Sequence, residues 1–216
     1  MSLSMMGQNI IEIHYRHVAS ENIAEFESKE MNHWSKVKQN AIDNGKLLAT
    51  AFFRVADAGM INDESRPTHA FVLVYKDFKQ LENGMQIWAN AEAVLGMDPS
   101  LISTNDISKV LMVDRFKLID ELLPLQEFKY AVWNYSKPKD LTGFVNENLK
   151  LWKPHFQKNL GKNGFAGWGI LAKVYPQGMN ESSIVSYDHY TDMASALQAL
   201  SPMDYDTSIL SKSKMA

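Results

Sequence analysis

Residues 30–55 read EMNHWSKVKQNAIDNGKLLATAFFRV, and this stretch joins an amphipathic helix to a strand in one continuous piece of chain. Its first half repeats apolar side chains at helical spacing, with Trp34 and Val37 on one face. Gly45 predicts the end of that helix, because glycine adopts the left-handed conformation that helix ends often need. The Phe-rich and Val-rich residues 47–56 are typical of a strand. A helix that leads directly into a strand is therefore the unit from which the fold is inferred.

The segments around this stretch give the order strand, helix, hairpin, helix, strand. Residues 10–16 alternate apolar and polar side chains, which indicates a strand with one buried face. The other elements are expected as a helix over 20–44, a hairpin with strands 47–56 and 69–75, a helix over 77–95 and a strand over 110–117.

The same order starts again in the second half of the chain. Its elements are expected as a strand over 130–135, a helix over 140–159, strands over 165–175 and 183–190, and a helix over 193–200. Landmarks recur at an offset of roughly 115 to 120 residues, such as Trp34 with Trp152. The sequence therefore predicts a tandem duplication.

The expected boundaries follow from this repeat. Residues 1–8 are interpreted as an expression tag or disordered N-terminus, residues 9–124 as the first repeat and residues 125–216 as the second. Nothing in the second repeat corresponds to the strand at 110–117. That repeat is expected to lack its last strand, to borrow an edge, or to continue past Ala216.

This order of elements resembles the dimeric α/β-barrel superfamily, in the tandem-duplicated, single-chain form expected of a bacterial member. The resemblance rests on the paired helix-strand blocks 30–55 and 148–175. It implies an α+β fold of two ferredoxin-like βαββαβ units whose antiparallel sheets pack together as an α/β barrel. It also implies oxygenase, isomerase or decyclising chemistry without an organic cofactor.

Composition narrows the partners. The formal net charge is -3 and the 22 Lys and Arg residues are scattered, so nucleic acid is not an expected partner. The absence of Cys removes disulfides, thiolate nucleophiles and thiolate metal sites. No apolar stretch reaches the roughly 18 residues of a membrane span, so no membrane partner is expected. We expect a soluble monomer or homodimer, cytoplasmic unless a leader has been removed from an exported protein.

Polar residues interrupt the apolar helix stripes of both repeats at similar places. A buried carboxylate or imidazole needs a partner, so such residues point to a cavity that contains water or a ligand. The predicted pocket lies between sheet and helices and is lined by Glu30, His33, Trp34, Asn148, Trp152 and His155. The alternative is that Glu30 and His33 lie at the edge of the stripe and reach solvent. Pro154 is expected to bend the second helix near Trp152, unless the helix restarts there.

A second polar group is expected on the strands. Glu12, His14 and Arg16 alternate along the first strand and share one face, onto which Arg54 and His69 are expected to project from neighbouring strands. Such a patch, inside the barrel or at its rim, could orient an anionic group or perform acid–base work. The alternative is a satisfied hydrogen-bond network or a solvated edge. No metal site is expected.

Three functions are consistent with these features, and whether the protein is an enzyme stays open. The leading hypothesis is a site for a small apolar or aromatic molecule. The second is haem binding, because duplicated members of the superfamily bind haem; His69, His155 or His189 would then be the axial ligand. Apart from that, no cofactor is expected. The third is a non-catalytic binding or assembly module.

Overall fold

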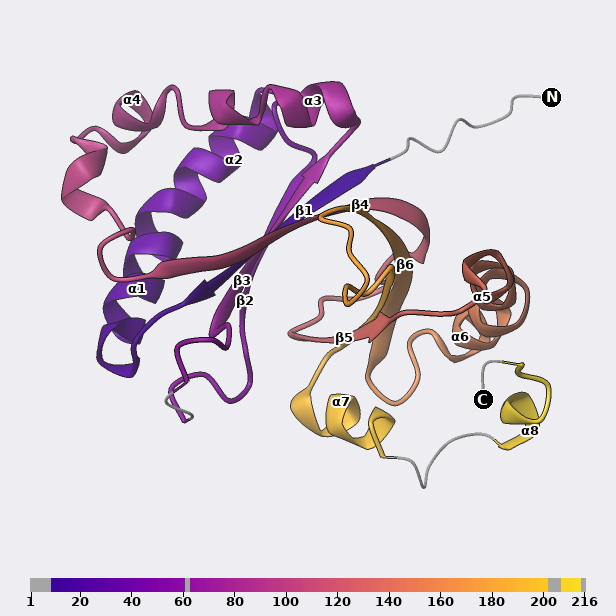
Figure 1. Ribbon diagram of the computed structural model, residues 1–216. Helices are drawn as coiled ribbons and strands as arrows, with labels where there is room; N and C mark the ends of the chain where they lie inside the picture. Colours follow the sequence, from indigo (N-terminus) through magenta and orange to yellow (C-terminus); the bar gives the residue numbers. More distant parts are fainter. Residues whose placement is uncertain (1–8, 61–62, 202–206, 215–216) are drawn as a thin grey trace. The chain divides into compact units, whose positions relative to one another are not determined.

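The computed structural model describes residues 9–60, 63–201 and 207–214, so the tag or disordered segment expected at 1–8 lies outside the described residues. The chain divides into two compact units, Met1–Phe116 and Lys117–Ala216 (Figure 1). Both units combine strands and helices, which gives the expected α+β class. The boundary falls inside strand β4 (Lys109–Leu122), so that β4 contributes residues to both units.

The first unit is built on a sheet with the strand order β2-β3-β1-β4. β1 (Ile10–His17) and β2 (Ala49–Arg54) each run antiparallel to β3 (His69–Tyr75), which lies between them. β2 and β3 form the predicted hairpin. The register pairs Arg16 with His69, so the even-numbered residues of β1 share one face of the sheet with the odd-numbered residues of β3.

A long helical segment packs on that face, where the sequence predicts a helix over 20–44. It runs through η1 (Ser20–Asn22), α1 (Ile23–Lys29), the π-helical turn η2 (Glu30–Trp34) and α2 (Ser35–Asp43). Its apolar stripe and the sheet share a core that includes Phe26, Ala41, Ile10, Phe71 and Leu73. Gly45 follows the helix with a φ of 66°, as its position in the sequence predicts.

The single helix expected over 77–95 is wrong. The chain forms α3 (Phe78–Glu82), the 3₁₀ turn η3 (Gly84–Ile87) and α4 (Ala91–Leu95), followed by the 3₁₀ turn η4 (Pro99–Ile102). Gly84 begins η3 and packs closely on β3, because a Cβ at this position would lie 3.1 Å from the Tyr75 hydroxyl. Breaking the helix brings η4 and the residues after it over the sheet, where they line a pocket described below.

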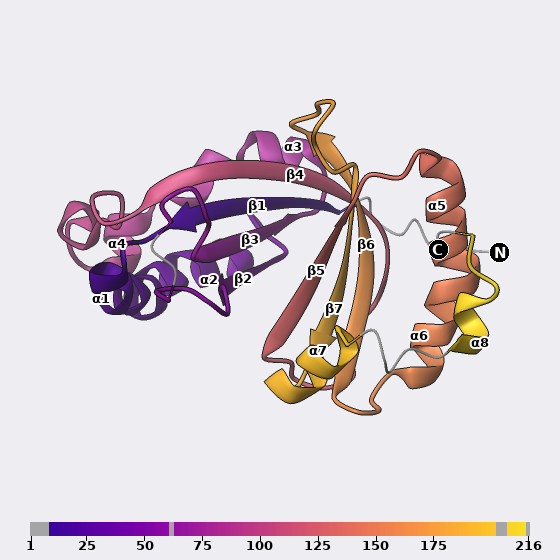
Figure 2. The ribbon, with the colours of Figure 1, turned by 60° about the horizontal axis from the view of Figure 1, so that its bottom comes forward.

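The second unit has the strand order β4-β6-β7-β5. β5 (Tyr130–Ser136) and β6 (Phe165–Tyr175) each run antiparallel to β7 (Ile184–Tyr190). Its long helical segment, beside the strands in Figure 2, comprises α5 (Leu141–Glu147), the π-helical turn η5 (Asn148–Trp152) and α6 (Lys153–Asn159). α7 (Met193–Ala199) packs on the same core, and α8 (Thr207–Leu210) is a short helix near the C-terminus.

The edges of the second sheet show what stands in place of the strand expected to be missing from the second repeat. Among the described residues, no strand borders β5 on its outer side, where a counterpart of β4 would lie. Instead, β4 borders the opposite edge of this sheet, beside β6. The second sheet therefore lacks the expected edge strand within the described residues and shares β4 at its other edge.

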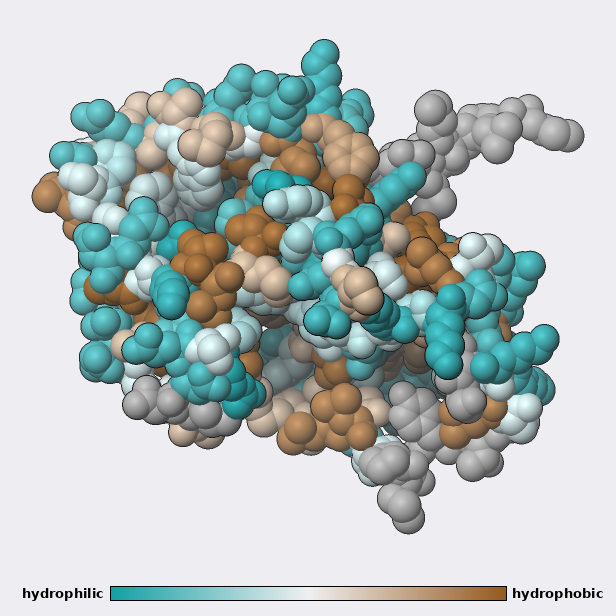
Figure 3. Space-filling model, in the orientation of Figure 1, coloured by the Kyte–Doolittle hydropathy of each residue, from teal (hydrophilic) through white to brown (hydrophobic). Residues whose placement is uncertain are grey.

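Exposed apolar side chains are spread over the surface. Met31, Leu101 and Met179 are examples from separate elements, with exposed fractions of 65%, 72% and 90%. On the face shown in Figure 3, hydrophilic residues surround small separate groups of apolar ones. Scattered exposed apolar residues are ordinary in folded proteins, so these side chains do not mark a binding surface.

Candidate functional site

A pocket of about 430 Å³ lies in the first unit, between the sheet and the long helical segment. We call it the Arg16 pocket. Strand residues form its floor, the helical segment forms one wall, and the region from α4 to the loop after η4 forms the other. Its lining consists of His14, Arg16, Glu30, Trp34, Lys38, Phe71, Leu73, Trp88, Ala91, Pro99, Ser103, Thr104 and Asn105.

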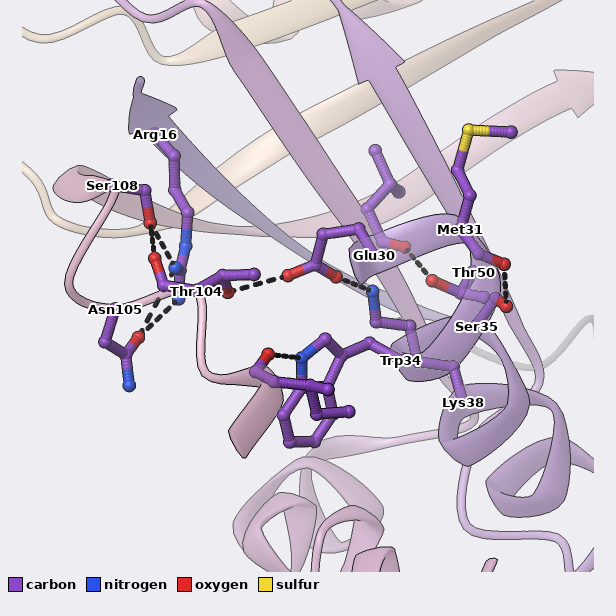
Figure 4. A network of polar contacts seen from close by, with 12 residues as sticks. Arg16, Glu30, Met31, Trp34, Ser35, Lys38, Thr50, Thr104, Asn105 and Ser108 are labelled. Carbon is purple, nitrogen blue, oxygen red and sulfur yellow. Dashed lines mark hydrogen bonds and ion pairs between the residues drawn. The ribbon is translucent and has the colours of Figure 1, made fainter. Parts of the chain in front are cut away.

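Arg16 is the most informative polar residue on the floor. Its Nη1 donates to the Ser108 hydroxyl at 2.8 Å and to Asn105 Oδ1 at 3.4 Å (Figure 4). Its Nε is buried and has no hydrogen-bond partner in the described part of the chain. Burial lowers the pKa of the guanidinium from its ordinary value, and the nearby Glu30 carboxylate opposes that shift. A buried donor without a partner is costly and therefore favours an acceptor brought by a ligand.

His14 lines the same pocket as Arg16 and contacts the Glu12 carboxylate. Its Nε2 lies 2.7 Å from Glu12 Oε1, and Arg115 Nε donates to Glu12 Oε2 at 2.6 Å. Burial alone would raise the pKa of the Glu12 carboxyl, but its contacts with His14 and Arg115 hold that pKa below its ordinary value. Glu12 is therefore ionised at neutral pH and orients the His14 ring toward the pocket wall.

Glu30 of the π-helical turn and Lys38 of α2 form a buried ion pair in the pocket wall. Lys38 Nζ lies 2.9 Å from Glu30 Oε2, and the Thr104 hydroxyl donates to Glu30 Oε1 at 2.9 Å (Figure 4). Burial lowers the pKa of Lys38 from its ordinary value, while Glu30 opposes the shift. The Lys38 ammonium also lies 4.4 Å from the centre of the Phe71 ring. Lys38 is thus committed to Glu30, which leaves Arg16 as the cation available to a ligand.

Two tryptophans form an aromatic wall. The rings of Trp34 and Trp88 meet edge to face with their centres 5.8 Å apart. Trp34 Nε1 donates to the Ile102 carbonyl at 3.0 Å, which fixes the orientation of the indole. Such a wall offers apolar ring faces and edges against which an aromatic ligand can pack.

The structure brings together residues that the sequence treated as two groups. Glu30 and Trp34 from the helix line the same pocket as His14 and Arg16 from β1. Glu30 is buried, with 7% of its surface exposed, and so does not reach solvent as the alternative supposed. The polar strand face lies under the helical segment. The sequence predicted this polar face inside the barrel or at its rim. In the structure, Glu12, His14 and Arg16 instead share their sheet face with the core residues that pack on α1 and α2.

Other predicted residues do not line this pocket. His33 is partly exposed and lies outside the lining. Arg54 and His69 are on the same sheet face, but both contact Glu27, at 3.5 Å and 3.1 Å respectively. The fully buried His69 also contacts the Thr68 hydroxyl at 2.9 Å. These residues form a satisfied network, which was the alternative considered for the strand patch.

In the second unit, His155 lines a second pocket of about 440 Å³, between the sheet and α6 and α7, and the lining of that pocket does not include Asn148 or Trp152. Asn148 donates to the Phe144 carbonyl of its own helix at 3.0 Å, and Trp152 Nε1 donates to Glu147 at 3.3 Å. Pro154 lies in the first turn of α6, directly after η5, so the helix accommodates it at the π-helical turn.

Several residues of the Arg16 pocket were missed by sequence reasoning. Lys38 follows Trp34 by four residues and so lies on the same helix stripe, a spacing that could have revealed it. Trp88 and Thr104 come from the region expected to be one helix and a loop, where no periodic signal existed. The pairing of Thr104 with Glu30 joins residues 74 positions apart, and spacing in the sequence carries no trace of it.

The histidines proposed for haem differ in their surroundings. His69 is held between Glu27 and Thr68, and His189 is stacked on Phe128 with ring centres 3.7 Å apart. His155 lines the second pocket, where its Nε2 lies 3.4 Å from the Asn159 side-chain amide. The lining of that pocket combines polar residues, Asp188 among them, with apolar ones such as Phe156 and Phe165. None of the three histidines is singled out as an axial ligand, and haem binding stays a prediction.

The described residues contain no helix with the length and apolar character that crossing a membrane requires. Nor do they bring three or more His, Asp or Glu side chains together in a group able to hold a metal ion.

Comparisons with known proteins show the fold. No family model and no curated protein matches the chain. Among solved structures, a monooxygenase-like protein of Fusobacterium nucleatum is 14% identical with a TM-score of 0.57, over 90% of this chain and 81% of its own. An anthrone oxidase-like protein is 13% identical with a TM-score of 0.53, over 96% and 84% of the two chains. A haem-binding protein from Thermus thermophilus is 11% identical with a TM-score of 0.50, over 92% and 84%. At these identities the likeness shows the fold alone, which this chain shares with these three proteins.

Proposed function

We propose that the first unit binds a small aromatic molecule that carries an anionic oxygen, in the Arg16 pocket. The observation that carries the proposal is the buried Arg16 Nε, which has no hydrogen-bond partner in the described residues although it borders a cavity. A carboxylate or phenolate oxygen would accept that hydrogen bond as a charge-assisted one. The ring of the same molecule would pack against Trp34 and Trp88.

The charges of the pocket agree with an anionic ligand. Two cations, Arg16 and Lys38, face one carboxylate, Glu30, while Glu12 is paired with both His14 and Arg115. An anion bound beside Arg16 would balance the excess positive charge in a site shielded from water.

Proton transfer on such a ligand is part of the proposal. Histidine is the side chain that ordinarily exchanges protons near neutral pH, and His14 lines the pocket with Glu12 behind it. His14 would take the proton of a phenol or enol, and Arg16 would hold the oxyanion that results. The anthrone oxidase-like neighbour is named for an aromatic ketone, which agrees with an aromatic compound that carries an ionisable oxygen as the substrate class.

Calorimetric titration with 2-naphthoate and its neutral analogue 2-naphthalenemethanol tests this function. The wild-type protein should bind the anion more tightly, by about tenfold or more, because a hydrogen bond to a charged group contributes about 1.5–3 kcal/mol. Arg16→Gln should remove that preference.

The matched control is Arg54→Gln, which changes an arginine on the same sheet face that contacts Glu27 and does not line the pocket. This variant should keep the wild-type preference. Equal binding of the two compounds by the wild type, or an unchanged preference in Arg16→Gln, would overturn the proposal.

We also infer that the two units are tandem ferredoxin-like copies. The order β2-β3-β1-β4 in the first unit is the ferredoxin-like order, and β6-β7-β5 repeats its first part. Each long helical segment contains a π-helical turn, at Glu30–Trp34 and at Asn148–Trp152. An experimental structure in which these turns and their sheets do not superpose would contradict the inference.

A further inference from the structure

We propose that the second unit holds a separate site for a small organic amine, in the pocket floored by Asp188. This site shares no residue with the Arg16 pocket and stands independently of the function proposed for it. The pocket of about 440 Å³ lies between the sheet, α6 and α7.

Asp188 occupies the centre of the floor. It lies on β7 between Val132 of β5 and Trp168 of β6, on the face that α6 and α7 cover. Its Oδ2 accepts a hydrogen bond from Asn134 Nδ2 at 3.1 Å. Its Oδ1 is buried and has no partner among the described residues, although the residue as a whole is partly exposed to the pocket.

A carboxylate in this position requires a donor. An ionised carboxylate has room for about four hydrogen bonds, and Asp188 receives one from the described chain. Burial raises the pKa of Asp188 to about 7, while the Asn134 hydrogen bond opposes the rise. The protein therefore holds the ionised form at a cost, which a ligand with a positive donor would offset.

The other titratable groups of the pocket do not supply that donor. Lys162 and His155 line the cavity, but among the described residues neither has a hydrogen bond or ion pair with Asp188. The His155 ring is engaged by Asn159. A protonated primary amine carries three N–H donors on one nitrogen, so it would supply the hydrogen bond that Asp188 Oδ1 lacks among the described residues.

The rest of the lining fits the remainder of such a ligand. Phe156, Phe165 and Leu200 offer apolar surface for a hydrocarbon or aromatic body. Ser195 and Gln198 of α7 border the same cavity and can accept from the other ammonium hydrogens. The two units thus present pockets that prefer ligands of opposite charge, an anion beside Arg16 and a cation beside Asp188.

The test is calorimetric titration of the full chain with phenethylamine, and with 2-phenylethanol as its neutral analogue. At pH 8, where Asp188 is mostly ionised and the amine is protonated, the amine should bind about tenfold or more tightly than the alcohol. Asp188→Asn should abolish this difference. Glu127→Gln, an exposed change in the same unit, should preserve it.

A second readout keeps the test decisive if Asp188→Asn changes the fold. Titrating the wild type at pH 6 in two buffers of different ionisation enthalpy should show proton release on amine binding, because Asp188 must ionise. The release should vanish at pH 8.5. No binding of the amine, equal binding of amine and alcohol, or binding at pH 6 without proton release would overturn the proposal, and a bound water would then be the donor to Asp188.

Discussion

Replacing Glu30 by Gln tests the charge arrangement of the Arg16 pocket. The Glu30 carboxylate contacts Lys38 at 2.9 Å and accepts from Thr104 at 2.9 Å, and its charge also acts on Arg16. Both Glu30 and Lys38 are buried, with 7% of each residue exposed. In Glu30→Gln, two cations would face each other without a counter-charge. Removing one partner of a buried pair costs about 3–5 kcal/mol, and we expect Glu30→Gln to lower the free energy of unfolding by that amount.

Replacing Lys38 should lower the free energy of unfolding by less than replacing Glu30. In Lys38→Met, the Glu30 carboxylate keeps the Thr104 hydrogen bond and the field of Arg16, and the methionine still packs on Phe71. We expect a loss of about 1.5–3 kcal/mol, the value of a hydrogen bond to a charged group. The double variant Glu30→Gln, Lys38→Met should be more stable than Glu30→Gln, because it removes the unpaired ammonium along with the carboxylate.

Urea unfolding followed by tryptophan fluorescence measures these differences, since Trp34 and Trp88 lie in the same pocket. Glu25→Gln is the matched control: Glu25 forms an exposed pair with Lys29 at 2.6 Å on the same helical segment, and its loss should cost under about 1 kcal/mol. The reasoning is refuted if Glu30→Gln is no less stable than Lys38→Met, or if the double variant is the least stable of the three.

Two further perturbations test other parts of the structure. Because the pKa of Asp188 is raised to about 7, wild-type stability should decline as pH rises from about 4 to 7, whereas Asp188→Asn should lack this decline. The variant should therefore be the more stable protein at pH 8 by at most a few kcal/mol, and thermal unfolding that shows the same pH dependence for both would contradict the burial of that carboxylate. Gly169→Ala should lower stability by about 1–3 kcal/mol, since its Cβ would overlap the Tyr187 ring. The same change in a Tyr187→Val background should cost less, and an equal cost in the two backgrounds would show that the ring is not the obstacle.

Local patterns in the sequence predict most of the strands and the long helical segments. The expected strand 69–75 coincides with β3, and 165–175 coincides with β6. Residues 69–75 form a nearly continuous apolar run after a polar loop, and residues 165–175 are rich in apolar and aromatic side chains, so local sequence indicates both strands. The helix expected over 77–95 is interrupted at Gly84, where the chain packs against Tyr75, and helical spacing does not reveal such a tertiary contact.

The candidate site was predictable in part for a similar reason. Glu30 could be selected because it interrupts the apolar stripe of its helix, and Trp34 because it lies on that stripe. His14 and Arg16 could be selected because they are polar residues on one face of an alternating strand. That they meet in one pocket depends on the helical segment lying on the even-numbered face of β1, which alternation alone does not specify. Asp188 went unnoticed since β7 alternates too weakly to single out one carboxylate, and its significance comes from neighbours on β5 and β6.

A crystal structure of the full chain with 2-naphthoate is the most direct test of ligand binding by the first unit. We expect a carboxylate oxygen within hydrogen-bonding distance of Arg16 Nε, and the naphthalene rings against Trp34 and Trp88. Density for the ligand elsewhere, or an Arg16 Nε satisfied by a protein side chain with the pocket closed, would contradict the account.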